Sequence, residues 1–262
     1  MALIERDGAQ IYWEAVGDGP PLMMVAGLGG VATYWNPQLP AFSPKYRVIL
    51  HDQRGTGRSS HVPVKSVAQM ADDALAVMDA AGVEKAFYLG HSTGGAIGTA
   101  LALKHPDRIA GLVINASTTH GDAYRHKLLG LRKTLLAMDR PDAYASYTTL
   151  LLYPHWYINQ NAEQLAADEA AAAKTLGGAE VQGSRLDAIL AFDPRAELPS
   201  LSVPVLVLCA RDDILTPLYF SQEYADLIPQ AQFTVLETGG HAASRTLTAE
   251  YDRIVLDFCS SL

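Results

Sequence analysis

The chain has 262 residues, of which 49% are hydrophobic and 18% are charged, and its 28 acidic and 20 basic residues give a formal net charge of −8. This apolar content is enough for a large core and excludes a disordered chain, and the length fits one large α/β domain or a domain with an insertion. The acidic balance argues against nucleic acid or an anionic membrane surface as a partner.

Short apolar segments alternate with longer segments of helical periodicity. Ala2–Arg6 and Gln10–Val16 flank Asp7-Gly8-Ala9 and predict an antiparallel hairpin. Helices are predicted at Val67–Ala81 and Ala96–Leu103, where apolar residues recur every three or four positions. Further strands are predicted at Leu22–Ala26, Arg47–Leu50, Ala86–Leu89, Ile109–Ile114, Val203–Leu208 and Gln232–Leu236. This alternation predicts an α/β fold with a mostly parallel sheet covered by helices on both faces.

Between Asn115 and about Leu198 the alternation stops. This stretch is rich in Ala, Tyr, Leu and His and contains no clear strand pattern. Ala166–Lys174 is a strong helix-forming segment, and Gly177-Gly178 is expected to end that helix. We therefore predict a helical insertion over one end of the sheet, after which the alternation resumes at Val203.

The sharpest functional signal is Gly90-His91-Ser92-Thr93-Gly94, which follows a predicted strand and precedes a predicted helix. A Gly-x-Ser-x-Gly sequence in that setting is typical of a strained turn that exposes a nucleophilic serine above a sheet. Glycines on either side of the serine allow the strand and the helix to approach closely. We interpret Ser92 as the nucleophile, and we expect the neighbouring His91 to point away from it.

A serine hydroxyl needs a base to accept its proton and an acid to orient that base. His241 lies in the Gly-rich segment Thr238-Gly239-Gly240-His241 after the last predicted strand, and is the candidate base. The acid is expected after the strand Val203–Leu208, where Asp212 and Asp213 both stand. We prefer Asp213, with Asp212 as the alternative, and expect the unused aspartate to be a solvated turn residue.

Two backbone N–H groups are needed to hold the negative charge that develops on the substrate oxygen. Thr93, directly after the nucleophile, is expected to supply one. The Gly-rich loop Ala26-Gly27-Leu28-Gly29-Gly30 is expected to supply the other, from Leu28. A flexible turn without a role in chemistry is the alternative for this loop.

These segments together resemble the α/β-hydrolase superfamily over about residues 10–260. The segment from Asp52 to Ser59 (sequence DQRGTGRS) resembles a structural loop of that superfamily. The resemblance implies an eight-stranded sheet with a helical cap. We accordingly divide the chain into an α/β-hydrolase core of residues 1–116 and 199–262 and a cap of residues 117–198.

A closer resemblance is to the pyrimidine-utilisation protein D family, whose members are described as aminoacrylate or carbamate hydrolases. It is carried by Gly27-Leu28-Gly29-Gly30, Tyr34-Trp35-x-x-Gln38-Leu39, Asp52-Gln53-Arg54-Gly55-Thr56-Gly57, Leu152-Tyr153-Pro154-x-Trp156, Ala191-Phe192-Asp193 and Gly239-Gly240-His241-Ala242. The 3-oxoadipate enol-lactonase family shares much of this pattern. The resemblance implies a serine hydrolase of a small aminoacrylate, carbamate, ester or amide, with a lactonase or general carboxylesterase as the alternative.

The candidate pocket residues are Gly27, Trp35, Tyr153 and Trp156, with packing of the aromatic rings between cap and core as the alternative. The basic residues of the predicted cap, Arg125, Arg132 and Lys133, could meet a carboxylate substrate, but a solvated helix face is the favoured interpretation.

Two activities outside hydrolysis stay open on the sequence alone. The His–Asp pair could serve a lyase or an oxygenase without a cofactor, and the same scaffold could carry a non-catalytic ligand receptor, although nothing in the sequence asks for one.

The remaining expectations concern cofactors, location and assembly. Cys209 and Cys259 have no metal-ligand spacing and are expected to be reduced, packed thiols, so no metal or other cofactor is implied. The charged first residues lack the apolar run of a secretory signal, and no apolar run reaches the roughly 18 residues that span a membrane. We expect a cytoplasmic monomer or homodimer that acts on a small molecule.

Overall fold

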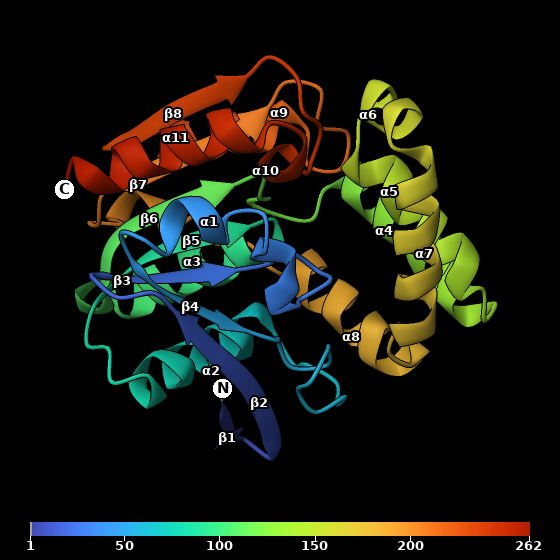
Figure 1. The fold of residues 1–262 in the computed structure, drawn as a ribbon, viewed down its shortest axis with the longest axis horizontal. Helices are drawn as coiled ribbons and strands as arrows, with labels where there is room; N and C mark the ends of the chain where they lie inside the picture. The colour runs from blue at the N-terminus through green and yellow to red at the C-terminus, as the bar shows by residue number, and fades with distance from the viewer. Residues whose placement is uncertain (1) are drawn as a thin grey trace.

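A computed structural model describes residues 2–262, and its centre is one eight-stranded sheet (Figure 1). The strand order is β1-β2-β4-β3-β5-β6-β7-β8, in which β2 runs antiparallel to β1 and β4 and the other neighbours are parallel. The strands are β1 (Ala2–Arg6), β2 (Ala9–Val16), β3 (Pro21–Val25), β4 (Arg47–His51), β5 (Ala86–His91), β6 (Ile109–Asn115), β7 (Val205–Ala210) and β8 (Ala231–Leu236). The predicted hairpin and the mostly parallel sheet are therefore confirmed.

One strand starts later than predicted. β7 begins at Val205 rather than Val203, because Pro204 has no N–H to donate to a neighbouring strand. The Pro204 carbonyl still accepts a hydrogen bond from the Leu112 N–H at 2.9 Å, so the chain enters the sheet at this residue.

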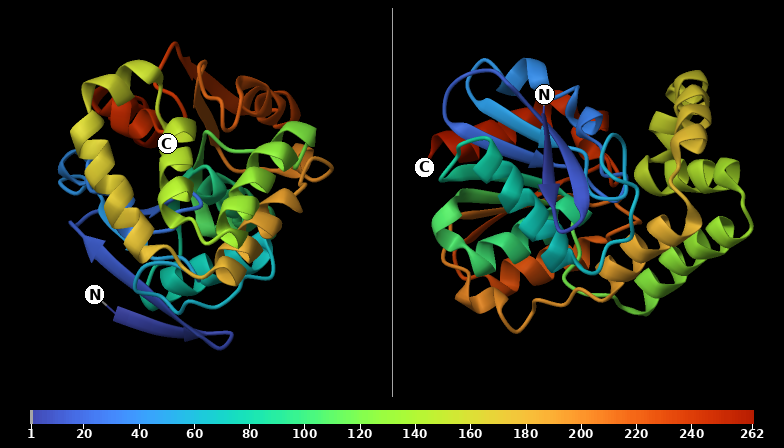
Figure 2. Two further views of the ribbon diagram at one scale, coloured as in Figure 1. Left: turned by 90° about the vertical axis from the view of Figure 1, so that its right-hand side faces the viewer. Right: turned by 90° about the horizontal axis from the view of Figure 1, so that it is seen from below.

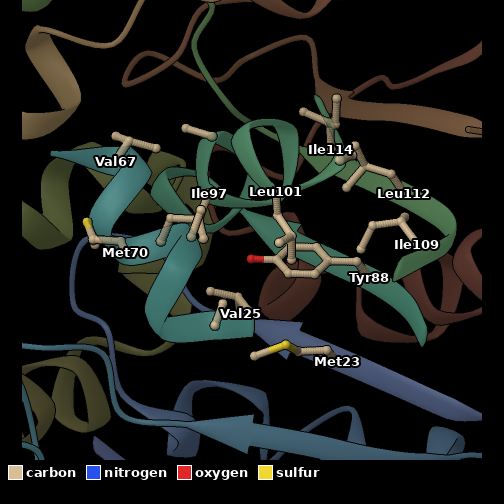
Figure 3. Close-up of a cluster of buried hydrophobic side chains, with 14 of the residues drawn as sticks. Met23, Val25, Val67, Met70, Tyr88, Ile97, Leu101, Ile109, Leu112 and Ile114 are labelled. Atoms are coloured by element: carbon tan, nitrogen blue, oxygen red, sulfur yellow. The ribbon is translucent and has the colours of Figure 1, made fainter. Parts of the chain in front are cut away.

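The two faces of the sheet carry separate cores, because side chains alternate between the faces along each strand. Met23 and Val25 of β3 point into the core beneath α2 (Val67–Ala80), α3 (Thr93–Lys104) and α9 (Leu218–Leu227), part of which Figure 3 shows. Leu22 and Met24 point into the opposite core, beneath η1 (Ala32–Trp35), α1 (Leu39–Phe42) and α11 (Thr248–Ser260). The short elements η2 (Pro106–Arg108), η3 (Leu198–Ser200) and α10 (Ala243–Thr246) lie in the connections.

Five helices lie beside the sheet as a separate layer (Figures 1 and 2). They are α4 (Ala123–Ala137), α5 (Pro141–Leu152), α6 (His155–Gln160), α7 (Ala162–Thr175) and α8 (Ala179–Leu190). Arg185 of α8 bonds the loops after β3 and β4, and the Leu152 carbonyl of α5 accepts from Ala242 N–H after β8, so the layer covers the carboxyl ends of the strands. The boundaries assigned above, residues 1–116, 117–198 and 199–262, stay a prediction.

The structure also bears on the expectations for the cysteines and for membrane-spanning segments. Cys209 and Cys259 are both buried and free. Within residues 2–262, every helix is too short or too polar to cross a membrane.

Candidate active site

The turn between β5 and α3 holds Ser92 in an uncommon backbone conformation, with φ of 54° and ψ of −117°. Such a conformation is strained for a residue with a side chain and persists only when the surrounding structure enforces it. Here the Ser92 N–H donates to the Asn115 carbonyl at 2.8 Å, and the Ser117 hydroxyl donates to the Ser92 carbonyl at 2.8 Å. A Cβ atom on Gly90 would overlap the Gly94 carbonyl, and one on Gly94 would overlap the Val25 carbonyl. Both glycines are therefore required by the close approach of strand and helix.

His241 follows Gly239 and Gly240, whose φ values of 130° and 65° bend the chain after β8 back over the sheet. The His241 side chain is 1% exposed, and its Nδ1 lies 2.8 Å from Asp213 Oδ2. The carboxylate at Nδ1 is a proton acceptor, so it holds the imidazole proton on Nδ1 and leaves Nε2 free to accept a proton. This is the tautomer that a general base requires.

Asp213 is itself held in place by the loop between β7 and α9. Its Oδ1 accepts from the Leu215 and Thr216 N–H groups at 2.8 and 2.9 Å, and its Oδ2 accepts from the Thr216 hydroxyl at 2.8 Å. Three local donors and the His241 ring thus fix both carboxylate oxygens. Of the two candidate aspartates, Asp213 is the one in contact with His241.

Asp212 has a different set of partners. It accepts from the Thr238 hydroxyl at 2.7 Å and from the Gly240 N–H at 2.8 Å, both in the segment that leads into His241. Thr238 also accepts a hydrogen bond from Trp156 Nε1 at 3.1 Å, which links the helical layer to this segment. The solvated turn residue expected at this position is instead a half-buried anchor of the histidine loop.

His91, which we expected to point away from Ser92, lies between Tyr34 and the candidate base. Its ring stacks on Tyr34 at 4.9 Å between centroids and lies 4.8 Å from the His241 ring, and its Nδ1 is 2.8 Å from Asn115 Nδ2. Burial lowers the pKa of His91 well below its ordinary value, and the nearby His241 lowers it further. A neutral His91 therefore packs against the candidate base and limits the movement of its ring.

The loop Ala26–Gly30 lies against the nucleophile turn. A Cβ on Gly27 would approach the Ser92 Cβ to 3.1 Å, so a larger residue would push the loop away from Ser92. The loop is closed by a hydrogen bond from the Gly30 N–H to the Gly27 carbonyl at 3.0 Å, and the Leu28 carbonyl accepts from Arg185 at 2.9 Å. Thr93 is the first residue of α3, where backbone N–H groups have no partner inside the helix.

A cavity of about 480 Å³ lies between these loops and the helical layer. Ser92, His241, Leu28 and Thr93 form part of its wall on the sheet side. Gly27 and Tyr153, two of the four candidate pocket residues, also line it. The other two lie elsewhere: Trp35 is fully buried in the core beneath α11, and Trp156 is half-buried and bonded to Thr238.

Two arginines of α4 are buried, although we expected them on a solvated helix face. Arg125 and Arg132 are 4% and 5% exposed and line the cavity, whereas Lys133 is exposed and pairs with Asp187 at 2.7 Å. Their spacing of seven residues places the two arginines on one face of a helix. That spacing was the available sequence signal, but periodicity alone does not say which face of a helix is covered.

Arg185 was not singled out from the sequence. Its fully buried guanidinium donates to the Arg54 carbonyl at 2.5 Å, the Leu28 carbonyl at 2.9 Å and Gln53 Oε1 at 2.7 Å. A lone arginine in a helix of mixed polarity carries no sequence signal for such a position. The structure shows it joining α8 to the loop beside the nucleophile.

Comparison with known proteins agrees with this architecture. Residues 20–244 match the family described as the alpha/beta hydrolase fold. The chain is 37% identical over 255 residues to the "Putative carbamate hydrolase RutD" of Azorhizobium caulinodans, covering 97% of this chain and 96% of that protein. It is 37% identical over 242 residues to the protein of the same name from Stutzerimonas stutzeri, covering 92% and 91%. Among solved structures, the enol-lactonase of Burkholderia xenovorans LB400 is 25% identical with a TM-score of 0.91, covering 99% of this chain and all of that one.

Proposed function

Since the chain belongs to the alpha/beta hydrolase fold family, we propose that this hydrolase uses Ser92, His241 and Asp213 to cleave a small carbonyl substrate of the aminoacrylate or carbamate type, or a small ester or amide. The observation that carries the proposal is the 2.8 Å contact between Asp213 Oδ2 and His241 Nδ1 in a site whose serine stands on a strained turn. The relatives named as carbamate hydrolases support the substrate class.

In the proposed reaction, Ser92 Oγ attacks the carbonyl carbon while His241 Nε2 accepts the hydroxyl proton. The oxygen that becomes negative is held by the N–H groups of Leu28 and Thr93. His241 then gives its proton to the leaving group, and a water molecule releases the acyl group from Ser92. For a carbamate, His241 could instead activate water for direct attack on the carbonyl carbon, and no acyl-enzyme would form. In an aminoacrylate the nitrogen is on the carbon β to the carboxylate, so activated water would add at that carbon of the imine tautomer and ammonia would leave.

Asp213 contributes by holding the imidazole proton on Nδ1 and by stabilising the imidazolium after proton transfer. The Leu215 and Thr216 N–H groups hold the Asp213 carboxylate in place before the reaction, so this loop does not have to rearrange in the transition state. Asp212 supports the same step from the other side, because it fixes the Gly240 N–H directly before His241.

A lactonase is the second candidate. The supporting observation is the likeness to the Burkholderia enol-lactonase, which extends over the whole of that chain. The same three side chains would open a lactone by attack of Ser92 on the ring carbonyl, with the alcohol oxygen leaving but remaining attached to the acyl chain. Turnover of an enol-lactone in preference to a carbamate would favour this candidate.

Steady-state turnover of p-nitrophenyl acetate, p-nitrophenyl butyrate, an enol-lactone, a simple carbamate and an aminoacrylate precursor tests the proposal. Ser92→Ala is expected to lose up to about 10⁶-fold in kcat. Ser200→Ala is the matched control, because this serine is exposed and its hydroxyl donates to the Glu197 carbonyl. A fluorophosphonate should label the native protein but not Ser92→Ala. Full turnover by Ser92→Ala on the preferred substrate would instead mean a water- or base-driven reaction through His241.

A further inference from the structure

The inner face of α4 brings two buried arginines to the cavity. Arg125 and Arg132 both line it, and each is more than nine-tenths buried. Arg125 donates to the Leu215 carbonyl at 2.8 Å, close to the loop that carries Asp213. Arg132 donates to the Thr148 hydroxyl at 2.6 Å and lies 5.0 Å from the Tyr144 ring centroid. Both guanidinium groups are thus held by neutral partners.

Neither arginine forms an ion pair with a carboxylate of residues 2–262, and the Nε of each is buried without a hydrogen-bond partner in that part of the chain. Burying a cation is unfavourable unless an opposite charge compensates it. Asp213 and Asp122 both attract Arg125, but neither carboxylate bonds its guanidinium. The oxygens of Asp213 are occupied by His241 and the Thr216 loop. Those of Asp122 accept from the Arg125 backbone N–H and the Tyr219 hydroxyl. Two buried positive charges therefore face the cavity without an anion of their own.

Burial lowers the pKa of Arg125 to about 10, and repulsion from Arg132 contributes to the lowering. Arg125 still carries its charge at neutral pH. Both arginines line the cavity from the same helix, about two turns apart. The acidic residues of the cavity wall are Asp168 and Glu169 on α7, which are more exposed and stand on a different helix. The cavity wall therefore combines the two buried cations of α4 and the partly exposed Arg245 with the two carboxylates of α7, in a protein whose net charge is −8.

We propose that Arg125 and Arg132 form an anion subsite that binds a carboxylate carried by the substrate at a distance from the carbonyl that Ser92 attacks. The proposal rests on the proposed function and narrows it to substrates that carry one carboxylate apart from the bond that is cleaved. A cavity of about 480 Å³ lies within the range of pockets that hold drug-sized ligands, so it has room for a spacer between the two groups. Arginine suits this role because its planar fork can give two parallel hydrogen bonds to one carboxylate.

The test compares hydrolysis of monomethyl glutarate, a monoanion, with that of dimethyl glutarate, its neutral counterpart. The native enzyme is expected to prefer the monoanion in kcat/KM. In Arg132→Gln this preference should fall by about 10- to 100-fold, the loss expected for a hydrogen bond to a charged group. Lys133→Gln is the matched control, since Lys133 is the adjacent residue of α4 but pairs with Asp187 outside the cavity. An unchanged preference in Arg132→Gln would overturn the subsite.

A binding measurement separates this proposal from the hydrolase proposal. Free glutarate should bind Ser92→Ala in calorimetry as it binds the native protein, and should bind Arg132→Gln at least tenfold more weakly. Equal binding of glutarate by Arg132→Gln would overturn the subsite even if esters are cleaved. If Arg132→Gln does not fold, Arg132→Lys replaces it in both measurements. Inhibition of the native enzyme then gives a further test: glutarate, but not the neutral glutaramide, should inhibit the hydrolysis of dimethyl glutarate. Equal inhibition by the neutral diamide would count against an anion site.

Discussion

Replacing either of the two adjacent aspartates by asparagine should affect a different property: catalysis for Asp213 and stability for Asp212. In Asp213→Asn, the side-chain oxygen would keep the hydrogen bonds from the Leu215 and Thr216 N–H groups. The amide nitrogen must then occupy the position of Oδ2, 2.8 Å from His241 Nδ1. An N–H facing Nδ1 forces the imidazole proton onto Nε2, which can then no longer accept the proton of Ser92. The expected loss in kcat is about 10⁴-fold, or about 5 kcal/mol in the activation free energy.

Asp212→Asn should act on the stability of the protein and leave the chemistry nearly intact. An asparagine oxygen can still accept from the Gly240 N–H, but the charge that both Thr238 and Gly240 now contact is lost. We expect the free energy of unfolding to fall by about 1 kcal/mol, which lowers Tm by roughly 2–4 °C in a protein of this size. The kcat should stay within about tenfold of the native value, since the tautomer of His241 is unchanged.

For both variants, kcat would be measured with p-nitrophenyl acetate, and Tm would be measured by thermal unfolding followed by circular dichroism. Asp213→Asn should still fold, because the amide oxygen can accept from the Leu215 and Thr216 N–H groups, while the amide N–H can donate to the Thr216 hydroxyl, whose own proton goes to the Ala116 carbonyl. A large loss of kcat in Asp212→Asn with little loss in Asp213→Asn would refute the assignment of the acid. Less than a tenfold loss in both would refute any use of the His–Asp pair in the rate-limiting step.

Two more predictions concern groups outside the catalytic set. Arg185→Met removes the donor of three acceptors, the buried Arg54 carbonyl and Gln53 Oε1 and the partly buried Leu28 carbonyl, so we expect a lower free energy of unfolding. In the folded fraction we expect kcat to fall by up to about 10²-fold with a smaller change in KM. Steady-state kinetics at a temperature where the variant is folded would check this, and a native kcat would contradict it. Burial raises the pKa of Asp252 from 3.8 to about 6, so the folded protein binds the proton of this carboxyl more tightly than the unfolded chain does. The stability that the bound proton contributes is therefore lost as the pH rises from about 4 to about 6. Asp252→Asn should remove that loss and be about 1–2 kcal/mol more stable than the native protein at pH 7.5 but not at pH 4; urea unfolding at the two pH values measures the difference, and an equal difference at both would rule out the titration of Asp252.

The fold could be predicted from local patterns because each strand and helix carries its own periodicity. The strands of the sheet were located to within one or two residues, with the shift in β7 caused by Pro204. The Gly-x-Ser-x-Gly turn was equally local, since the clashes that a Cβ would make at Gly90 and Gly94 demand those residues at that spacing. The sequence alone therefore determined the sheet, its helical cover and the position of Ser92.

Contacts between distant segments could be decided only by the tertiary structure. The choice between Asp213 and Asp212 depends on which carboxylate meets a histidine 28 positions away, and both aspartates fit the same sequence pattern. In the same way, the periodicity of α4 puts Arg125 and Arg132 on one face but does not say whether that face meets water or the cavity. Burial depends on what packs against a helix, so only the assembled layer above the sheet shows that these charges are enclosed beside the site.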